Sequence, residues 1–162
     1  MKYLEGPEGK EAMKFINKAA LLALKSTCQR DRCGSVIIKN GKVLGKGFNS
    51  PPANLETQRR CLKKHELEPG FKTDKTCCIH AEIRAIMDAL RKKSKEIVGS
   101  RLYFIRLDSN GNKSPAGKPY CTYCSKMSLD AGIKEFVLLH DKGVCVYNTK
   151  EYNDLSFQFK PE

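Results

Sequence analysis

The order of helical and strand-like patterns constrains the fold of this chain more than any other feature. A helix is predicted from about residue 8 to 27, because apolar residues recur there at three- and four-residue steps. These residues are Met13, Ile16, Ala20 and Leu24. Two strand-like runs follow in residues 35–48, around Asn40-Gly41, a dipeptide that tolerates the positive φ angles of a tight hairpin turn. The chain is therefore expected to begin with a helix and a hairpin.

Two further helices are predicted after a long polar segment. Residues 49–79 show no clear periodicity, and a stretch of this length is too long for an ordinary connection, which indicates a loop with a function. A helix is expected from Ala81 to about Lys95, and another from about Thr122 to Ala131, where Gly132 is a typical helix end. The apolar face of the first of these helices consists of Ile83, Ile86, Met87 and Leu90.

Three more runs have the composition of strands, and they complete the pattern. They cover residues 101–107, 134–139 and 144–147, and Thr149 is a candidate cap for a last short helix. Strands that alternate with helices in this way predict an α/β fold, in which one mixed five-stranded sheet is flanked by helices.

Length, cysteine content and charge set the remaining bounds. The 162 residues correspond to a single domain, and no apolar run approaches the roughly 18 residues that cross a membrane. The first fifteen residues lack the apolar segment of a secretory signal, so a cytoplasmic location is expected, with the eight cysteines as thiols or metal ligands. The net charge of +12 indicates either phosphate-bearing partners, nucleic acid included, or simply a solvated basic surface.

Three residues with metal-binding side chains stand at the starts of two predicted helices. His80 precedes one helix, while Cys121 and Cys124 lie three residues apart at the start of the other, so both sulfurs can bind one ion. Three protein ligands are typical of a catalytic zinc, which keeps its fourth position for a water whose pKa falls to about 7. Glu82, two residues after His80, is then the candidate catalytic residue that moves a proton between this water and a substrate.

Each part of this pattern has a structural alternative. A single histidine in front of an apolar helix often has only a structural role, and a C-x-x-C pair is also found in redox sites and zinc ribbons. A ribbon needs a second C-x-x-C, which the chain lacks. The combination of H-A-E at 80–82 with P-x-C-x-x-C at 119–124 matches the signature of zinc-dependent nucleobase deaminases.

From about Ala12 to Phe136 the chain resembles the cytidine and deoxycytidylate deaminase superfamily, most of all its deoxycytidylate branch. Beyond H-A-E, the resemblance lies in "VLGKGFNSPP" at 43–52, in the cysteine- and histidine-bearing insertion at about 49–79, and in "AGIKEFV" at 131–137. It implies a three-layer α/β/α fold in one domain spanning 1–162, one catalytic zinc, a homo-oligomer, and a dCMP-like substrate that is deaminated at C4.

Four residues are candidates for substrate binding. The asparagine of the family's G-[YF]-N motif contacts the nucleotide, and Asn49 holds its place; the others are Phe48, Ala81 and Tyr120. This chain departs from the family at two positions. Tyr120 stands where the family commonly has proline directly before the first cysteine, and Arg84 stands where deoxycytidylate deaminases usually have asparagine.

The polar loop is also a candidate for a second, structural zinc. Some deoxycytidylate deaminases bind one with ligands from this region, and the candidates here are Cys61, His65, Cys77 and Cys78. The alternative is that these cysteines only pack as small apolar side chains.

Three functions stay open. The favoured one is deamination of a small cytosine nucleotide. The second is deamination of a base within RNA or single-stranded DNA, which the charge of +12 favours. The third is a non-catalytic zinc-stabilised binding module, which would have no use for Glu82 as a proton shuttle.

Overall fold

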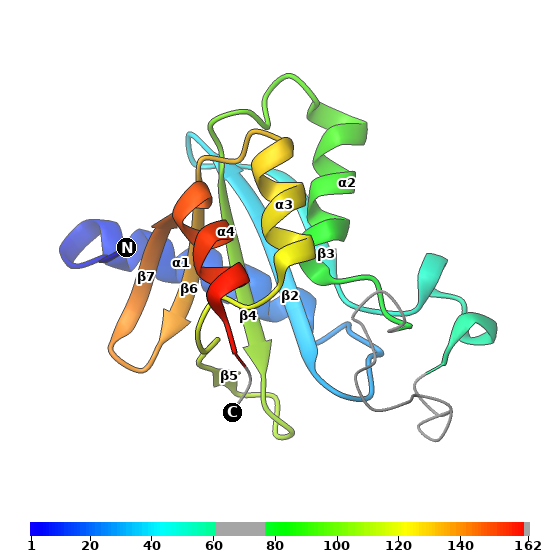
Figure 1. Cartoon of the computed structure of the whole chain (residues 1–162). Coiled ribbons are helices and arrows are strands. Elements are labelled where there is room, and N and C mark those ends of the chain that lie inside the picture. Colours follow the sequence, from blue (N-terminus) through cyan, green and yellow to red (C-terminus); the bar gives the residue numbers. More distant parts are fainter. Residues whose placement is uncertain (61–76, 161–162) are drawn as a thin grey trace.

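A mixed β-sheet with helices on both faces forms the centre of the molecule (Figure 1). The computed structural model describes residues 1–60 and 77–160. Within these ranges the sheet has seven strands in the order β1-β7-β6-β4-β2-β3, with β5 paired to β4. Only β4 and β6 run parallel; the other pairs are antiparallel. The strands are β1 (Lys2–Tyr3), β2 (Arg32–Lys39), β3 (Lys42–Phe48), β4 (Arg101–Leu107), β5 (Lys113–Ser114), β6 (Glu135–His140) and β7 (Gly143–Asn148).

The mixed sheet confirms the predicted fold class, but the expected number of five strands is too low. The two additional strands are β1 and β5, and each has only two residues. Such short strands show no alternation of apolar and polar residues, so periodicity does not detect them. β5 lies between β4 and Cys121, and it pairs with the end of β4.

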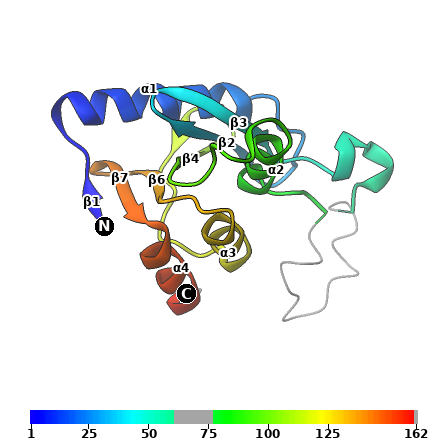
Figure 2. The ribbon, with the colours of Figure 1, turned by 90° about the horizontal axis from the view of Figure 1, so that it is seen from above.

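One long helix, α1 (Gly6–Ala23), covers one face of the sheet, above β2 and β4 (Figure 2). It packs closely there, since a Cβ added to Gly34 of β2 would lie 2.0 Å from the carbonyl oxygen of Ala19. The helix ends four residues earlier than predicted. Lys25 and Ser26 donate backbone hydrogen bonds three residues back, to Leu22 and Ala23, which tightens and ends the last turn. Its buried residues are Ala12, Phe15, Ile16, Ala19 and Ala23.

Three shorter helices cover the opposite face: α2 (Ala81–Lys93), α3 (Thr122–Asp130) and α4 (Thr149–Gln158) (Figure 2). The predicted first residues of α2 and α3, Ala81 and Thr122, are confirmed, and both helices end within two residues of the predicted positions. Gly132 follows α3 with a φ of 78°. Asn148, and not Thr149, caps α4, because its side chain accepts a hydrogen bond from the backbone of Lys150.

The contact between α2 and β3 corrects the predicted apolar face of this helix. A Cβ on Gly47 would lie 2.1 Å from the Ala81 carbonyl oxygen, so helix and strand touch through their backbones. Small side chains fit such a narrow gap, and the buried residues of α2 are Ala81, Glu82, Ile83, Ala85, Ile86 and Ala89. Met87 and Leu90, predicted to face the sheet, are instead 43% and 42% exposed.

Two local predictions are confirmed. Asn40 and Gly41 join β2 and β3 with φ angles of 49° and 71°, as the tight hairpin turn requires. Among the described residues, no helix combines the length and the apolar character needed to span a bilayer.

Candidate metal centre and active site

The first turns of α2 and α3 lie side by side at the same end of the helical layer (Figure 1). His80 is the residue before α2, and Cys121 is the residue before α3. The sulfur of Cys121 accepts a hydrogen bond from the backbone N–H of Cys124 at 3.3 Å, which caps the helix. Both helices therefore direct the positive ends of their dipoles toward the same place.

The side chains of His80, Cys121 and Cys124 form a compact donor set. The Nδ1 atom of His80 lies 3.2 Å from the sulfur of Cys124 and 3.4 Å from that of Cys121, and all three donor atoms lie within 4.8 Å of one another. Donors bound to one tetrahedral zinc at ordinary Zn–N and Zn–S lengths would be separated by about 3.5 Å. The geometry therefore fits zinc, and Nδ1, which faces the two sulfurs, is the His80 nitrogen that would bind it.

The thiolate of Cys121 gives this donor set a negative charge, which favours a cation. Hydrogen bonds from Cys124 and His80 lower the pKa of Cys121 to about 4, so its sulfur is a thiolate at neutral pH. The contact with Cys121 raises the pKa of His80 to about 9. At neutral pH His80 therefore carries a proton in the absence of metal, and zinc binding would displace this proton.

Glu82 lies in the first turn of α2 and is only 6% exposed. Burial raises the pKa of its carboxyl group, while the charge of His80 opposes this shift. No salt bridge to Glu82 is found among the described residues. A buried carboxyl group with a raised pKa next to a metal centre has the properties of a group that both takes up and releases a proton.

Asn49, a predicted substrate contact, uses most of its side-chain amide within the protein. Its Oδ1 accepts hydrogen bonds from the Ser26 hydroxyl at 2.7 Å and from the Cys33 backbone at 2.8 Å. Its Nδ2 donates to the Asp31 carbonyl at 2.7 Å. Asn49 therefore holds the connection between α1 and β2 against the end of β3. Its contact with substrate remains a prediction.

Arg84 ties α2 to the chain that follows β3. Its guanidinium group donates to the carbonyl oxygens of Ser50 and Pro51, at 3.3 and 2.7 Å, and its Cζ lies 6.0 Å from the centre of the Phe48 ring. Phe48, Asn49 and Ala81, all predicted to bind substrate, therefore belong to one wall formed by the end of β3 and the start of α2. In the sequence, Arg84 is recognisable only as a departure from the family. Its structural role could not be predicted, because its contacts are with residues more than thirty positions earlier in the chain.

Tyr120, the fourth predicted substrate contact, directly precedes Cys121 and is 50% exposed. Burial of the phenol, followed by the charge of Glu82, raises the pKa of Tyr120.

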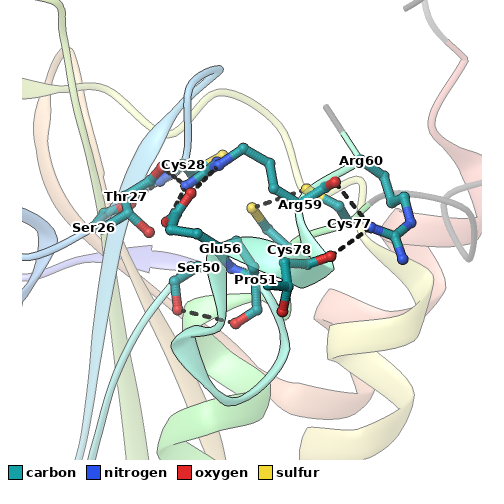
Figure 3. A network of polar contacts seen from close by, with 11 residues as sticks. Ser26, Thr27, Cys28, Ser50, Pro51, Glu56, Arg59, Arg60, Cys77 and Cys78 are labelled. Atoms are coloured by element: carbon teal, nitrogen blue, oxygen red, sulfur yellow. Dashed lines mark hydrogen bonds and ion pairs between the residues drawn. The ribbon is translucent and has the colours of Figure 1, made fainter. Parts of the chain in front are cut away.

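Figure 3 shows a second group of sulfur atoms, which belong to Cys28, Cys77 and Cys78. The sulfurs of Cys77 and Cys78 lie 3.7 Å apart. A hydrogen bond from Cys78 lowers the pKa of Cys28 to about 5, so Cys28 belongs to the same group, which sequence patterns did not indicate. Arg59 pairs with Glu56 and donates to the Thr27 carbonyl at 2.9 Å, which joins the loop to the segment that carries Cys28.

The predicted second zinc remains a prediction. Cys61 and His65 lie outside the described residues, and among the described ones only His80, Cys121 and Cys124 bring three donor atoms within 4.8 Å. If the loop does bind zinc, Cys61→Ser should lower the metal-to-protein ratio from about two toward one and also lower the Tm, since metal binding stabilises only the folded state. Elemental analysis measures the metal-to-protein ratio of Cys61→Ser and, as a control, of Cys145→Ser, a change in the hydrophobic core. A ratio that stays the same would leave these cysteines with a packing role.

Fold and site together define a class of protein, a zinc-dependent hydrolase whose His/Cys/Cys centre lies at two helix starts above a mixed sheet. The family model for the cytidine and deoxycytidylate deaminase zinc-binding region matches residues 10–140. The chain belongs to this family and is a deaminase with a zinc site at His80, Cys121 and Cys124. The resemblance inferred from its motifs is thereby confirmed.

Relatives of known function and solved structures agree with this assignment. The chain is 28% identical over 129 residues to the deoxycytidylate deaminase of Mycobacterium phage D29, covering 76% of this chain and 89% of the relative. It is also 28% identical over 141 residues to the human deoxycytidylate deaminase, covering 86% and 67%. The dCMP deaminase of cyanophage S-TIM5, solved with dCMP and dUMP, is 27% identical, with a TM-score of 0.56 and coverage of 82% of each chain.

A more distant structure supports the fold alone. Cytidine deaminase from Burkholderia pseudomallei is 18% identical and has a TM-score of 0.56, covering 86% of this chain and 94% of its own. The cytidine deaminase-like α/β/α fold is thus shared with proteins of low sequence similarity.

Proposed function

We propose that this chain deaminates dCMP, or a closely related cytosine nucleotide, to the corresponding uracil nucleotide. Water replaces the amino group at C4, and ammonia leaves. The observation that carries the proposal is the buried carboxyl group of Glu82 beside a His/Cys/Cys donor set. Several relatives are named deoxycytidylate deaminases, and the related cyanophage structure contains dCMP and dUMP, which differ by this replacement.

The residues of the site divide the work of such a reaction. When bound by His80, Cys121 and Cys124, zinc supplies a nucleophilic water at neutral pH. The carboxylate of Glu82 accepts a proton from the attacking water and donates it to N3 of the cytosine ring. Glu82 then takes the second proton of the former water from the oxygen now bonded to C4 and passes it to the departing amino group, so that ammonia and not an amide anion leaves. Its burial keeps bulk water from competing for these protons.

The wall formed by β3 and α2 orients the substrate in this proposal. Arg84 fixes the carbonyl oxygens of Ser50 and Pro51, and Asn49, one of whose two side-chain N–H groups donates to Asp31, is proposed to donate the other to the nucleotide. The phosphate of a mononucleotide is a compact dianion, which one or two basic residues near the pocket neutralise.

A base within a polynucleotide is the competing substrate. The net charge of +12 and the half-exposed rings of Tyr120 and Tyr123 next to the site favour it. Mononucleotide and polynucleotide differ in their salt dependence. Binding of a single strand releases about 0.7 counterions for each phosphate contacted, whereas a mononucleotide offers only one phosphate.

We expect dCMP to be the better substrate. The test measures kcat/KM from ammonia release for dCMP, deoxycytidine, CMP and a short cytosine-containing DNA strand. Each substrate is measured at about 50 and about 200 mM salt, a range over which binding to several phosphates weakens strongly. A kcat/KM for dCMP about tenfold or more above that for the strand, with a weak salt dependence, supports the proposal. Faster deamination of the strand with a steep salt dependence would assign the protein to nucleic acid, and no ammonia from any substrate would contradict a deaminase.

A further inference from the structure

Two partly exposed aromatic rings lie together beside the metal centre. Tyr120, which directly precedes Cys121, is 50% exposed, and Phe159, at the end of α4, is 38% exposed. Their ring centres are 5.8 Å apart and the ring planes are inclined by 51°, which is a favourable geometry for an aromatic pair. Each ring is held by the other while part of its surface remains open to a ligand.

The position of Phe159 is determined by the way α4 packs. This helix runs beside α3, and Ser125 of α3 donates a hydrogen bond to the Asn153 side chain of α4 at 2.8 Å. Tyr152 stacks on Phe136 of the sheet with a ring separation of 4.0 Å. At Phe159 the backbone becomes extended, and the last turn of α4 lies near the level of the first turn of α3 (Figure 1).

This contact comes from outside the part of the chain that defines the family. The family match ends at residue 140, whereas α4 and Phe159 follow it. The partner ring, Tyr120, is itself the residue inserted between Pro119 and Cys121, where the family commonly has proline next to the cysteine. The residue next to the metal ligand Cys121 therefore contacts a residue that follows the family-matched part of the chain.

We propose that Phe159 is a positioning residue, which holds the Tyr120 ring at the mouth of the site as the surface on which the substrate's nucleobase packs. The inference rests on the proposed function, because it requires a substrate with a flat base. A base is aromatic on both faces, and its stacking on a protein ring contributes substantially to affinity. The ring contacts the base before and during the reaction alike, so its effect appears in KM and not in kcat.

The test compares three variants of the zinc-loaded protein. Phe159→Leu keeps apolar volume but removes the ring, and Phe159→Tyr keeps the ring. Phe157→Leu is the matched control, because Phe157 is 62% exposed and its ring has no aromatic neighbour among the described residues. We expect Phe159→Leu to raise the KM for the preferred nucleotide by about tenfold, with kcat within about twofold, and the other two variants to leave both unchanged.

A double-mutant cycle then shows whether Phe159 acts through Tyr120. Tyr120→Ala should raise KM at least as much as Phe159→Leu, and in the Tyr120→Ala protein the Phe159→Leu change should have no further effect. Independent, additive effects on KM would overturn the inference. So would an unchanged KM in Phe159→Leu, or equal losses in Phe159→Leu and Phe157→Leu.

The outcome also separates this inference from the proposed function. If the unmodified protein releases no ammonia from any substrate, the proposed function fails and the inference fails with it. If turnover is normal but the KM values do not follow the expected pattern, only the role of Phe159 is contradicted.

Discussion

Replacing Glu82 by glutamine is expected to lower kcat by about 10²- to 10⁴-fold, the usual contribution of a positioned proton-transfer group. Glutamine has nearly the same shape, so it fits the buried space of a side chain that is only 6% exposed. Its neutral amide, however, does not accept a proton from water or donate one to N3 and the leaving amino group. Glu82 lies outside the donor set, so zinc should be retained.

The measurements are kcat for the preferred nucleotide, the zinc-to-protein ratio and the Tm. Glu96→Gln is a suitable control, since Glu96 follows the same helix and its side chain is 52% exposed in an ion pair with Lys93. It removes the same charge at a distance from the site, and its kcat should be unchanged. A Glu82→Gln protein with near-normal kcat would show that another group moves the protons.

The chemistry of the site was predictable because its spacing is local. His80 and Glu82 are two residues apart, Cys121 and Cys124 are three apart, and each pair stands at a helix start. Helical geometry alone then brings the members of each pair to one end. The meeting of the two helix starts depends on the whole fold. The sequence indicated it only because the combined motif resembles that of a known family.

The surroundings of the site were not predictable in the same way. Asn49 holds Ser26 and Cys33, and Cys28 meets Cys78, through contacts between residues that are 16 to 50 positions apart. No periodicity within a segment reports on such contacts. No local pattern assigns a role to Cys33, although burial and then the charge of Glu82 raise the pKa of its thiol.

The exposed side of α2 illustrates a different limit. Met87 and Leu90 fit an apolar stripe, yet Gly45 and Gly47 of β3 bring the strand so near that the alanines of α2 face it instead. Glycines inside a strand do indicate a close backbone approach. Hydrophobic periodicity ranks residues by size and apolar character, so it identifies the buried Ile83 and Ile86 but also includes the exposed Met87 and Leu90 where two backbones touch.

Replacing Cys124 by alanine is expected to release the zinc and abolish detectable deamination. Cys124 is fully buried, and its sulfur lies 3.2 Å from Nδ1 of His80. Without this ligand only two protein donors remain, which is fewer than zinc sites of either the structural or the catalytic kind use. The zinc-to-protein ratio should fall from about one to near zero for this site, as measured by elemental analysis after dialysis.

Loss of a buried sulfur also leaves a cavity, so the control must share that defect. Cys145 of β7 is equally buried but belongs to the hydrophobic core, away from the donor set. Cys145→Ala should lower the Tm through its cavity while zinc content and kcat stay near those of the unmodified protein. If Cys124→Ala kept its zinc and its activity, or if Cys145→Ala lost the zinc to the same extent, His80, Cys121 and Cys124 would not be the ligands on which catalysis depends.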